Sequence, residues 1–512
     1  MTSNNQDESP LFEVIPPYEC TPEQEALWGE RGKEAFTFKL LREPSTLKEL
    51  INYGNCIAIW HEEHKTMTYV ARYFGVRDPL DVQVLDISFG YANDAHLEFK
   101  IVGRTEAAVA ETAAFWIGCE KAEEGSEDIK LYGSSGHFDF RNAGSHCFVN
   151  MLQIRPLREV VFHRMMFSAE QAHVLATRPY ASNLNFWDCT FEDEGTAFVD
   201  GIQSRQSPLG CLALESFSNV GGQFFNYENM RRFCQSCMME ELLVSSLKEE
   251  WALLPFSAKA ESLFYISLSS TSLMGNDLQS LNIATPKLNL IIEHDDSTVP
   301  TELLTAFRRR VATLGHFVEL RVTWESNVDS FDVPECVIHE IIQAALANRD
   351  LRVLDFTEDD LNMNPHVGTL LEGLKDHNKL STIKMNVDVE SFGHDYSHIR
   401  KLISHNKNIV VTSIHDYIYT DGSTIDDLYS INRFYRGSAD LPLTLRPSLV
   451  ATALTEIASN DFRRSALLLS QHVDVLHELV LFAKFEERLK DSACSRLKRT
   501  IRNQPSRAAK KR

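Results

Sequence analysis

Short runs of hydrophobic residues recur in the second half of the chain, and stretches of helical spacing separate them. The runs Leu351–Phe356, Leu380–Met385 and Ile409–Ile414 begin 29 residues apart, with an apolar residue at the first and last place of each. Between the first two runs, the apolar residues of Val367–Leu374 lie three and four positions apart, so they share one face of a helix. One unit is therefore predicted to be a strand, a turn, a helix and a return.

Further strand-like runs lie upstream at spacings of roughly 20 to 35 residues. This irregular spacing indicates insertions and degenerate repeats. They are Leu157–Phe162, Leu184–Phe186, Leu209–Leu214, Leu263–Leu268, Leu288–Ile292 and His316–Val322. In Leu263–Leu268 the strand pattern is read from Leu263, Ile266 and Leu268.

The clearest single unit begins at Leu184. Leu184 and Phe186 are expected to point inward from a strand, Cys189 to sit in the turn, and Phe191 to fill the interior. A helix is expected to begin at Gly195, with its apolar residues buried on the inner side.

With this spacing the sequence resembles the leucine-rich repeat family, in particular the ribonuclease-inhibitor-like subclass with repeats of about 28 residues. Ser168–Leu175, Asn432–Gly437 and Ala466–Asp474 also look like segments of a group of algal (diatom-type) proteins with such repeats. The resemblance implies a curved α/β solenoid of degenerate repeats, with parallel strands on the concave face and helices on the convex face. It also implies protein binding, with no assigned reaction. The turn position of Cys189 becomes Asp359 and then Asp388, so no continuous Asn/Cys ladder is expected there.

Five segments are predicted along the chain. They are a disordered N-terminus (1–25), a mixed α/β cap (26–80), the repeat solenoid (81–423), a C-terminal helical cap (424–490) and a basic disordered tail (491–512).

Composition and charge bound the partners. The 512 residues are 43% hydrophobic and 24% charged, with a net charge of −21, so nucleic acid is not the expected partner. The resemblance implies another protein as the partner. No apolar run approaches the roughly 18 residues of a membrane span, and the polar start lacks a secretory signal. The ten scattered cysteines indicate a reducing compartment, cytoplasm or nucleus. The chain is expected to be monomeric apart from its partner.

The end of the chain is the one basic region. Arg507, Lys510, Lys511 and Arg512 form a candidate nuclear-import signal, with a solvated tail and a weak nucleic-acid contact as the alternatives.

Motifs for catalysis are weak. His61–His64 has its histidines three rather than four positions apart, so a solvated charged turn is favoured over a metal site. Cys234 and Cys237 form one C-x-x-C without a second pair, so two small, partly buried residues are favoured. Arg308–Arg310 is interpreted as a solvated helix face. No nucleotide-binding, hydrolase or kinase motif occurs, and no enzyme activity, metal or cofactor is predicted.

Binding is predicted on the strand face that points away from the helices, because side chains alternate across a strand. Trp187 is the favoured anchor, and packing against a neighbouring strand is the alternative for it. The residues expected on this face are Asn185, Trp187, Asn289, Ile291, Arg321, Thr323, Asp355, Thr357, Thr382 and Lys384.

The predicted function is a non-catalytic scaffold for protein–protein interaction. A substrate-recruiting adaptor is the alternative, an F-box-like ubiquitin ligase component with a recruiting helix around Leu40–Leu50 and repeats that select the target.

Overall fold

The computed structural model divides the chain into two compact units, which are described separately. Unit 1 comprises residues 1–331 and 358–361, and unit 2 comprises 332–357 and 362–512. The structure describes residues 10–28, 36–53, 56–71, 82–91, 95–119, 126–133, 137–149, 159–178, 183–216, 224–236, 238–274, 278–294, 300–326, 331–357 and 361–439.

Unit 1 begins with a mixed part in which most strand pairs are antiparallel. In this part β2 pairs in parallel with β3, and the pairs β1–β2, β3–β4, β4–β6, β6–β5 and β5–β7 are antiparallel. The strands are β1 (Phe12–Ile15), β2 (Phe36–Leu40), β3 (Cys56–His61), β4 (Thr66–Ala71), β5 (Gln83–Tyr91), β6 (Ala95–Gly103) and β7 (Asp128–Gly133). The helical segments here are η1 (Pro17–Glu19), α1 (Pro22–Ala26), η3 (Leu47–Tyr53) and α2 (Glu106–Gly118). The antiparallel hairpin of β5 and β6 lies inside the range 81–423 that was predicted to be solenoid.

The predicted disorder of residues 1–25 is wrong for the stretch from Phe12 onward. Strand β1 pairs along its whole length with β2, and α1 begins with a capping box between Thr21 and Gln24. Leu11 and Leu27 are buried at either end of this stretch. Backbone pairing and burial therefore order a segment whose prolines and acidic residues had indicated disorder.

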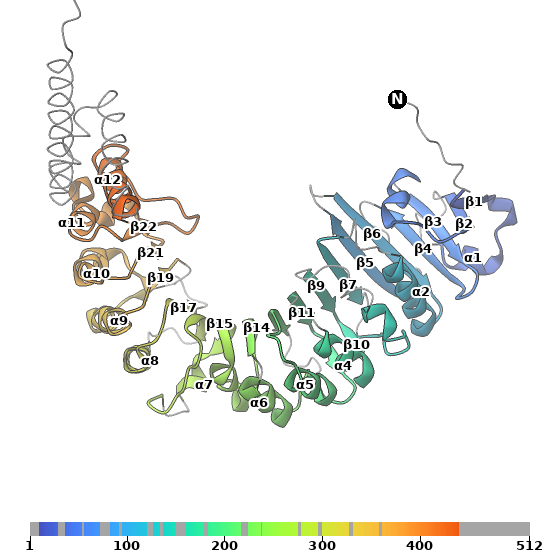
Figure 1. Ribbon diagram of the computed structural model, residues 1–512, viewed down its shortest axis with the longest axis horizontal. Coiled ribbons are helices and arrows are strands. Elements are labelled where there is room, and N and C mark those ends of the chain that lie inside the picture. The colour runs from blue at the N-terminus through green and yellow to red at the C-terminus, as the bar shows by residue number, and fades with distance from the viewer. Residues whose placement is uncertain are drawn as a thin grey trace, which may run out of the picture. The chain divides into compact units, whose positions relative to one another are not determined.

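From β7 onward the described strands of unit 1 form a parallel sheet that is not closed (Figure 1). Its strands pair in the order β7, β9 (Glu159–His163), β11 (Asn183–Trp187), β13 (Cys211–Glu215), β14 (Met238–Val244), β15 (Lys259–Ser269), β16 (Lys287–His294) and β17 (Glu319–Ser326). The connections carry α4 (Ala169–Thr177), α5 (Thr196–Gln203), α6 (Tyr227–Ser236), η5 (Glu249–Trp251), η6 (Leu254–Ser257), α7 (Ser270–Met274) and α8 (Thr301–Leu314). Short strands β8 (Phe138–Asp139), β10 (Met165–Phe167) and β12 (Thr190–Phe191) form a small parallel sheet. Helices α4, α5 and α6 lie side by side on one face of the parallel strands (Figure 1).

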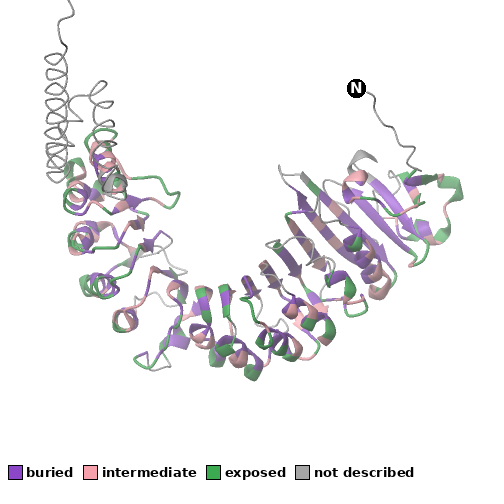
Figure 2. Cartoon of the chain, viewed as in Figure 1, coloured by how far each residue is buried: buried purple, intermediate pink, exposed green. Residues whose placement is uncertain are grey.

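The core of unit 1 lies between these strands and helices (Figure 2). Register places Leu184 beside Val160 and Leu212, and Phe186 beside Phe162 and Leu214, all of them buried. The Phe162 and Phe186 rings stack with their centroids 5.4 Å apart. Local signals agree with this packing, since Ser168 caps α4 and Gly195 precedes α5 with a φ of 83° that favours glycine.

Two interpretations from the sequence fail in unit 1. Tyr265, rather than Ile266, is the inward residue of β15, because Ser267 has a positive φ and the register shifts between Tyr265 and Leu268. Arg308 does not lie on a solvated helix face, since it is only 2% exposed and donates to the Val322 carbonyl at 3.2 Å.

Unit 2 repeats a helix and a short strand. Its strands β19 (Val353–Phe356), β21 (Thr382–Met385) and β22 (Val410–Thr412) pair in parallel. Its helices are α9 (Glu335–Ala347), η7 (Asn364–His366), α10 (Val367–Leu374), η8 (Val389–Phe392), η9 (His394–Tyr396), α11 (Ser397–His405) and α12 (Thr424–Ala439). The short strands β18 (Phe331–Asp332) and β20 (Leu361–Asn362) lie where the chain passes from one unit to the other.

The strand register in unit 2 corrects the predicted 29-residue period at its last step. Leu354 pairs with Ile383 at a separation of 29, but Ile383 pairs with Val411 at a separation of 28. Val411 is buried at this step, and Ile414, the last apolar residue of the predicted run, is 42% exposed beyond the strand.

A ladder of buried polar side chains links successive helix ends in unit 2. His377 Nε2 lies 3.1 Å from the Asn348 carbonyl oxygen, and Asn406 Nδ2 donates to the His377 carbonyl at 2.8 Å. The three residues are spaced by 29 and are each less than 10% exposed. The ladder joins helix ends, a different place in the unit from the turn of Cys189 where no such ladder was expected.

The end of the chain is described in part. Helix α12 covers the first helix predicted for the C-terminal cap, and the rest of the cap and the basic tail lie outside the described residues. Among the described residues, no helix combines the length and apolar character that a membrane span requires.

Candidate functional site

The parallel strands of unit 1 carry a row of rings on the face opposite the helices. Register aligns Tyr132 on β7 with His163 on β9, and His163 with Trp187 on β11. The ring centroids lie 5.7 Å apart for Tyr132 and His163 and 5.3 Å apart for His163 and Trp187. All three side chains are partly exposed. We call these three residues the ring ladder.

The strand ends hold the ring ladder in place. Arg164 and Asp188 follow His163 and Trp187 directly, and both adopt a positive φ that ends the strand. The amide of Arg164 donates to the Trp187 carbonyl, and the amide of Asp188 to the Glu215 carbonyl, each at 2.8 Å. Neighbouring strands therefore finish together, which keeps the rings in one row.

Two carboxylates continue the row beyond Trp187. Register aligns Trp187 with Glu215, and Asn185 Nδ2 donates to Glu215 Oε1 at 2.8 Å. The buried carboxylate of Asp188 accepts a hydrogen bond of 3.0 Å from the Ser216 hydroxyl. We call Asp188 and Glu215 the edge acids.

Burial and the nearby Arg164 lower the pKa of His163, against the opposing effect of Asp188. The imidazole in the middle of the ring ladder is thus neutral near pH 7. Burial also raises the pKa of the Tyr132 phenol, which keeps it protonated. The ring ladder therefore adds no charge of its own, and the local charge comes from the carboxylates.

A second row of side chains lies on the same face, two residues earlier on each strand, and it becomes more apolar toward its centre. It runs through Val161, Asn185, Ala213, Leu243, Phe264, Asn289 and Arg321. Ion pairs flank it, with Lys287 Nζ 3.2 Å from Glu319 Oε1 and Lys130 Nζ 3.6 Å from Asp128 Oδ2. The surface thus combines rings, a short apolar stretch and charged edges.

The ten residues predicted for the binding face divide between the two units. Unit 1 holds Asn185, Trp187, Asn289, Ile291, Arg321 and Thr323, and unit 2 holds Asp355, Thr357, Thr382 and Lys384. The structure brings Asn185 and Trp187 onto one strand, and pairs Asn289 with Arg321 across β16 and β17. In unit 2, Lys384 makes an ion pair of 2.6 Å with Asp416 and is partly exposed, as is Thr382.

Four of the ten are buried, so the expectation of an exposed position was wrong for them. Ile291 pairs with Thr323, at an end of the sheet where Val322–Trp324 are consecutively buried and both faces are enclosed. Asp355 Oδ1 accepts from the amide and hydroxyl of Thr357 at 2.9 and 2.7 Å, so these two side chains close the end of β19. The alternation of side chains along a strand predicts which face each side chain points to. Its solvent exposure depends on the neighbouring side chains on that face.

Sequence reasoning missed Tyr132, His163 and Glu215. His163 follows the inward Phe162 as Trp187 follows Phe186 and Glu215 follows Leu214. The signal was therefore available as the residue directly after the last inward position of each run.

Of the weak motifs, His61–His64 lies within the described residues and Cys234–Cys237 does so only in part. His61 is buried at the end of β3, where its ring packs edge-on against Trp116 at 5.2 Å, so the predicted solvated turn is wrong for this residue. Burial lowers the pKa of His61 to about 3. Cys234 is buried, and Cys237 lies outside the described residues. No group of three or more potential metal ligands occurs in the described part of the chain.

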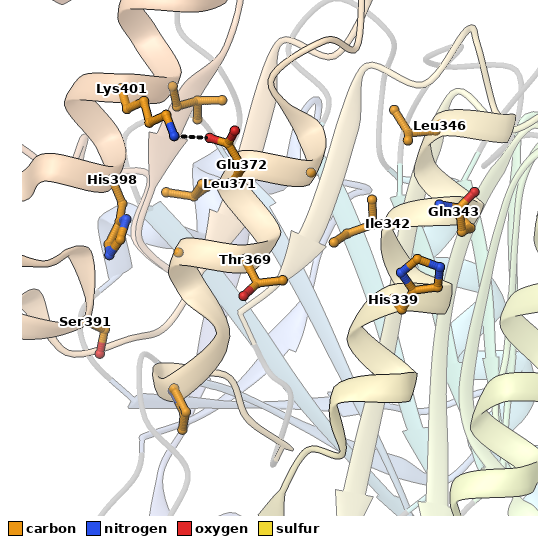
Figure 3. Close-up of a pocket in the computed structure, with 14 residues that line it drawn as sticks. His339, Ile342, Gln343, Leu346, Thr369, Leu371, Glu372, Ser391, His398 and Lys401 are labelled. Atoms are coloured by element: carbon orange, nitrogen blue, oxygen red, sulfur yellow. Dashed lines mark ion pairs between the residues drawn. The ribbon is translucent and has the colours of Figure 1, made fainter.

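Unit 2 has a pocket of about 830 Å³ along helices α9, α10 and α11 (Figure 3). His339 and Gln343 come from α9, Thr369 and Glu372 from α10, and His398 and Lys401 from α11. Glu372 and Lys401 form an ion pair of 2.9 Å, and hydrogen bonds from Lys375 and Lys401 lower the pKa of Glu372 to about 2. The two histidines come from different helices, and Figure 3 shows Thr369 between them.

Comparison of the sequence with protein-family models and with curated protein sequences finds no match.

Proposed function

We propose that the chain is a non-catalytic scaffold that binds another protein through the strand face of unit 1, centred on the ring ladder. The observation that carries the proposal is the row Tyr132–His163–Trp187, three rings in tilted and edge-to-face contact that are left partly exposed on a sheet face opposite the helices. Tryptophan and tyrosine are enriched at interface hot spots because they bury a large area and lose few rotamers.

We further propose that the repeating strands and helices form a degenerate leucine-rich repeat solenoid. Parallel strands in register, helices on one face and buried residues at equivalent positions in successive units support this proposal. The 29-residue spacing of Asn348, His377 and Asn406 also supports it. Nothing favours the adaptor alternative, since the described part of 36–71 holds three strands and one short 3₁₀ helix rather than a helical recruiting element.

Affinity capture of the tagged full-length chain from its native cells, with mass spectrometry, tests the binding role. The wild type is compared with Trp187→Ala and with Tyr417→Ala, an aromatic control whose side chain is 73% exposed in unit 2. A partner that is retained by Tyr417→Ala and lost on Trp187→Ala supports the proposal. A set of captured proteins that is the same for all three chains contradicts it.

A further inference from the structure

We propose that the ring ladder and the edge acids bind an arginine side chain on a segment of the partner protein, with the guanidinium stacked on Trp187 and paired with Glu215. This inference rests on the proposed protein-binding function and names the chemistry of the partner.

The geometry places an aromatic face and a carboxylate side by side. Trp187 and Glu215 occupy aligned positions on β11 and β13, and residues in aligned positions on neighbouring strands are about 5 Å apart. A planar guanidinium can stack on an indole and donate two hydrogen bonds to a carboxylate at the same time. A lysine ammonium is not planar and cannot donate two parallel hydrogen bonds to one carboxylate in this way.

Glu215 is positioned to accept such donors. Its Oε1 is held by Asn185 Nδ2 at 2.8 Å, which restricts the carboxylate while leaving it acceptor capacity, because a carboxylate has about four acceptor sites. A carboxylate that is already oriented loses less side-chain entropy when a partner binds.

Charge around Trp187 favours a cation. Glu159 on β9 and Glu241 on β14 lie on either side of Asn183 on β11 and Cys211 on β13 in one row across the strands. Asp188, which directly follows Trp187, adds a third carboxylate besides Glu215. Arg164 is the cation at the adjacent strand end. His163 is neutral near pH 7 because its pKa is lowered, so the ring ladder itself does not repel an arginine.

The test uses two labelled probe peptides, hexa-arginine and hexalysine, in fluorescence anisotropy with the full-length chain at 150 mM salt. Loss of a charge-assisted pair weakens binding by about ten- to a hundredfold. We therefore expect Glu215→Gln, which keeps the size of the side chain, to weaken hexa-arginine by at least about tenfold. Trp187→Ala is expected to act in the same direction, and hexalysine to bind more weakly than hexa-arginine.

The charge-matched control is Glu302→Gln, which removes an exposed carboxylate on α8 and is expected to change binding less than about twofold. Equal binding of hexalysine, or equal weakening by Glu302→Gln and Glu215→Gln, overturns the proposal and indicates general attraction to an acidic protein. Absence of hexa-arginine binding also overturns it. If the captured partner is nevertheless lost on Trp187→Ala, the binding function stands and only the arginine chemistry fails.

Discussion

A Phe→Ala substitution is expected to lower the free energy of unfolding much more on the inward face of the parallel sheet than on its outward face. Phe186 is fully buried, and its ring lies within 6.4 Å of the rings of Phe162, Phe167, Phe191, Phe198 and Phe224. Phe186→Ala removes a side chain from the middle of this cluster and leaves a cavity, which costs about 3–5 kcal/mol. Phe264 provides the matched control, because it is partly exposed on the opposite face of β15. Phe264→Ala is expected to cost about 1 kcal/mol.

Native-state hydrogen exchange with mass spectrometry measures this difference locally, which suits a chain of two units that need not unfold as one. A loss of about 4 kcal/mol corresponds to a roughly thousandfold faster exchange of amides that open together with β9, β11 and β13. Phe264→Ala is expected to change the same amides by less than about tenfold. If the two variants accelerate exchange equally, the assignment of inward and outward faces is refuted.

Further predictions concern buried polar groups. Because the His61 pKa is lowered to about 3 from an ordinary 6.5, its contribution to stability is complete above pH 6.5. It falls by about 1.4 kcal/mol per pH unit as pH drops toward 3, so urea midpoints should decline less steeply with acid for His61→Phe than for the wild type. Gln171→Met should cost about 1–3 kcal/mol in urea melts, since Gln171 Nε2 donates to two buried carbonyls at 2.9 and 2.6 Å. Asn406→Leu should cost a similar amount and speed exchange at the end of α11, whereas an unchanged exchange rate would contradict the ladder. Iodoacetamide should label the exposed Cys336 in the folded chain, and the buried Cys189, whose pKa burial raises to about 12, only after denaturant.

The periodic part of the fold could be predicted from the sequence because its signals are local. The spacing within Leu184–Phe186 and Val367–Leu374 is that of one strand and one helix, and the structure places β11 and α10 there. The ring ladder could not be predicted as a group, since Tyr132, His163 and Trp187 are 31 and 24 residues apart and meet only through strand register.

The failures also have physical causes. The shift at Ser267 and the change from a 29- to a 28-residue step before Val411 are single-residue events, which a search for a constant period averages away. Arg308 was interpreted from its charge alone, but its buried position depends on a carbonyl that β17 supplies. The order in Phe12–Ala26 likewise depends on pairing with β2.

Two glycines of α10 influence how strongly unit 2 bends. A Cβ at Gly373 would lie 2.7 Å from Ile342 of α9, and a Cβ at Gly368 would lie 2.8 Å from His398 of α11. Hydrogen bonds fix neighbouring strands about 4.8 Å apart, whereas packed helices ordinarily lie about 8–10 Å apart, and this mismatch curves any stack of strand–helix units. By letting α10 approach both neighbours closely, the two glycines reduce the mismatch. The absence of two side chains therefore makes the arc of unit 2 shallower than bulkier residues would allow.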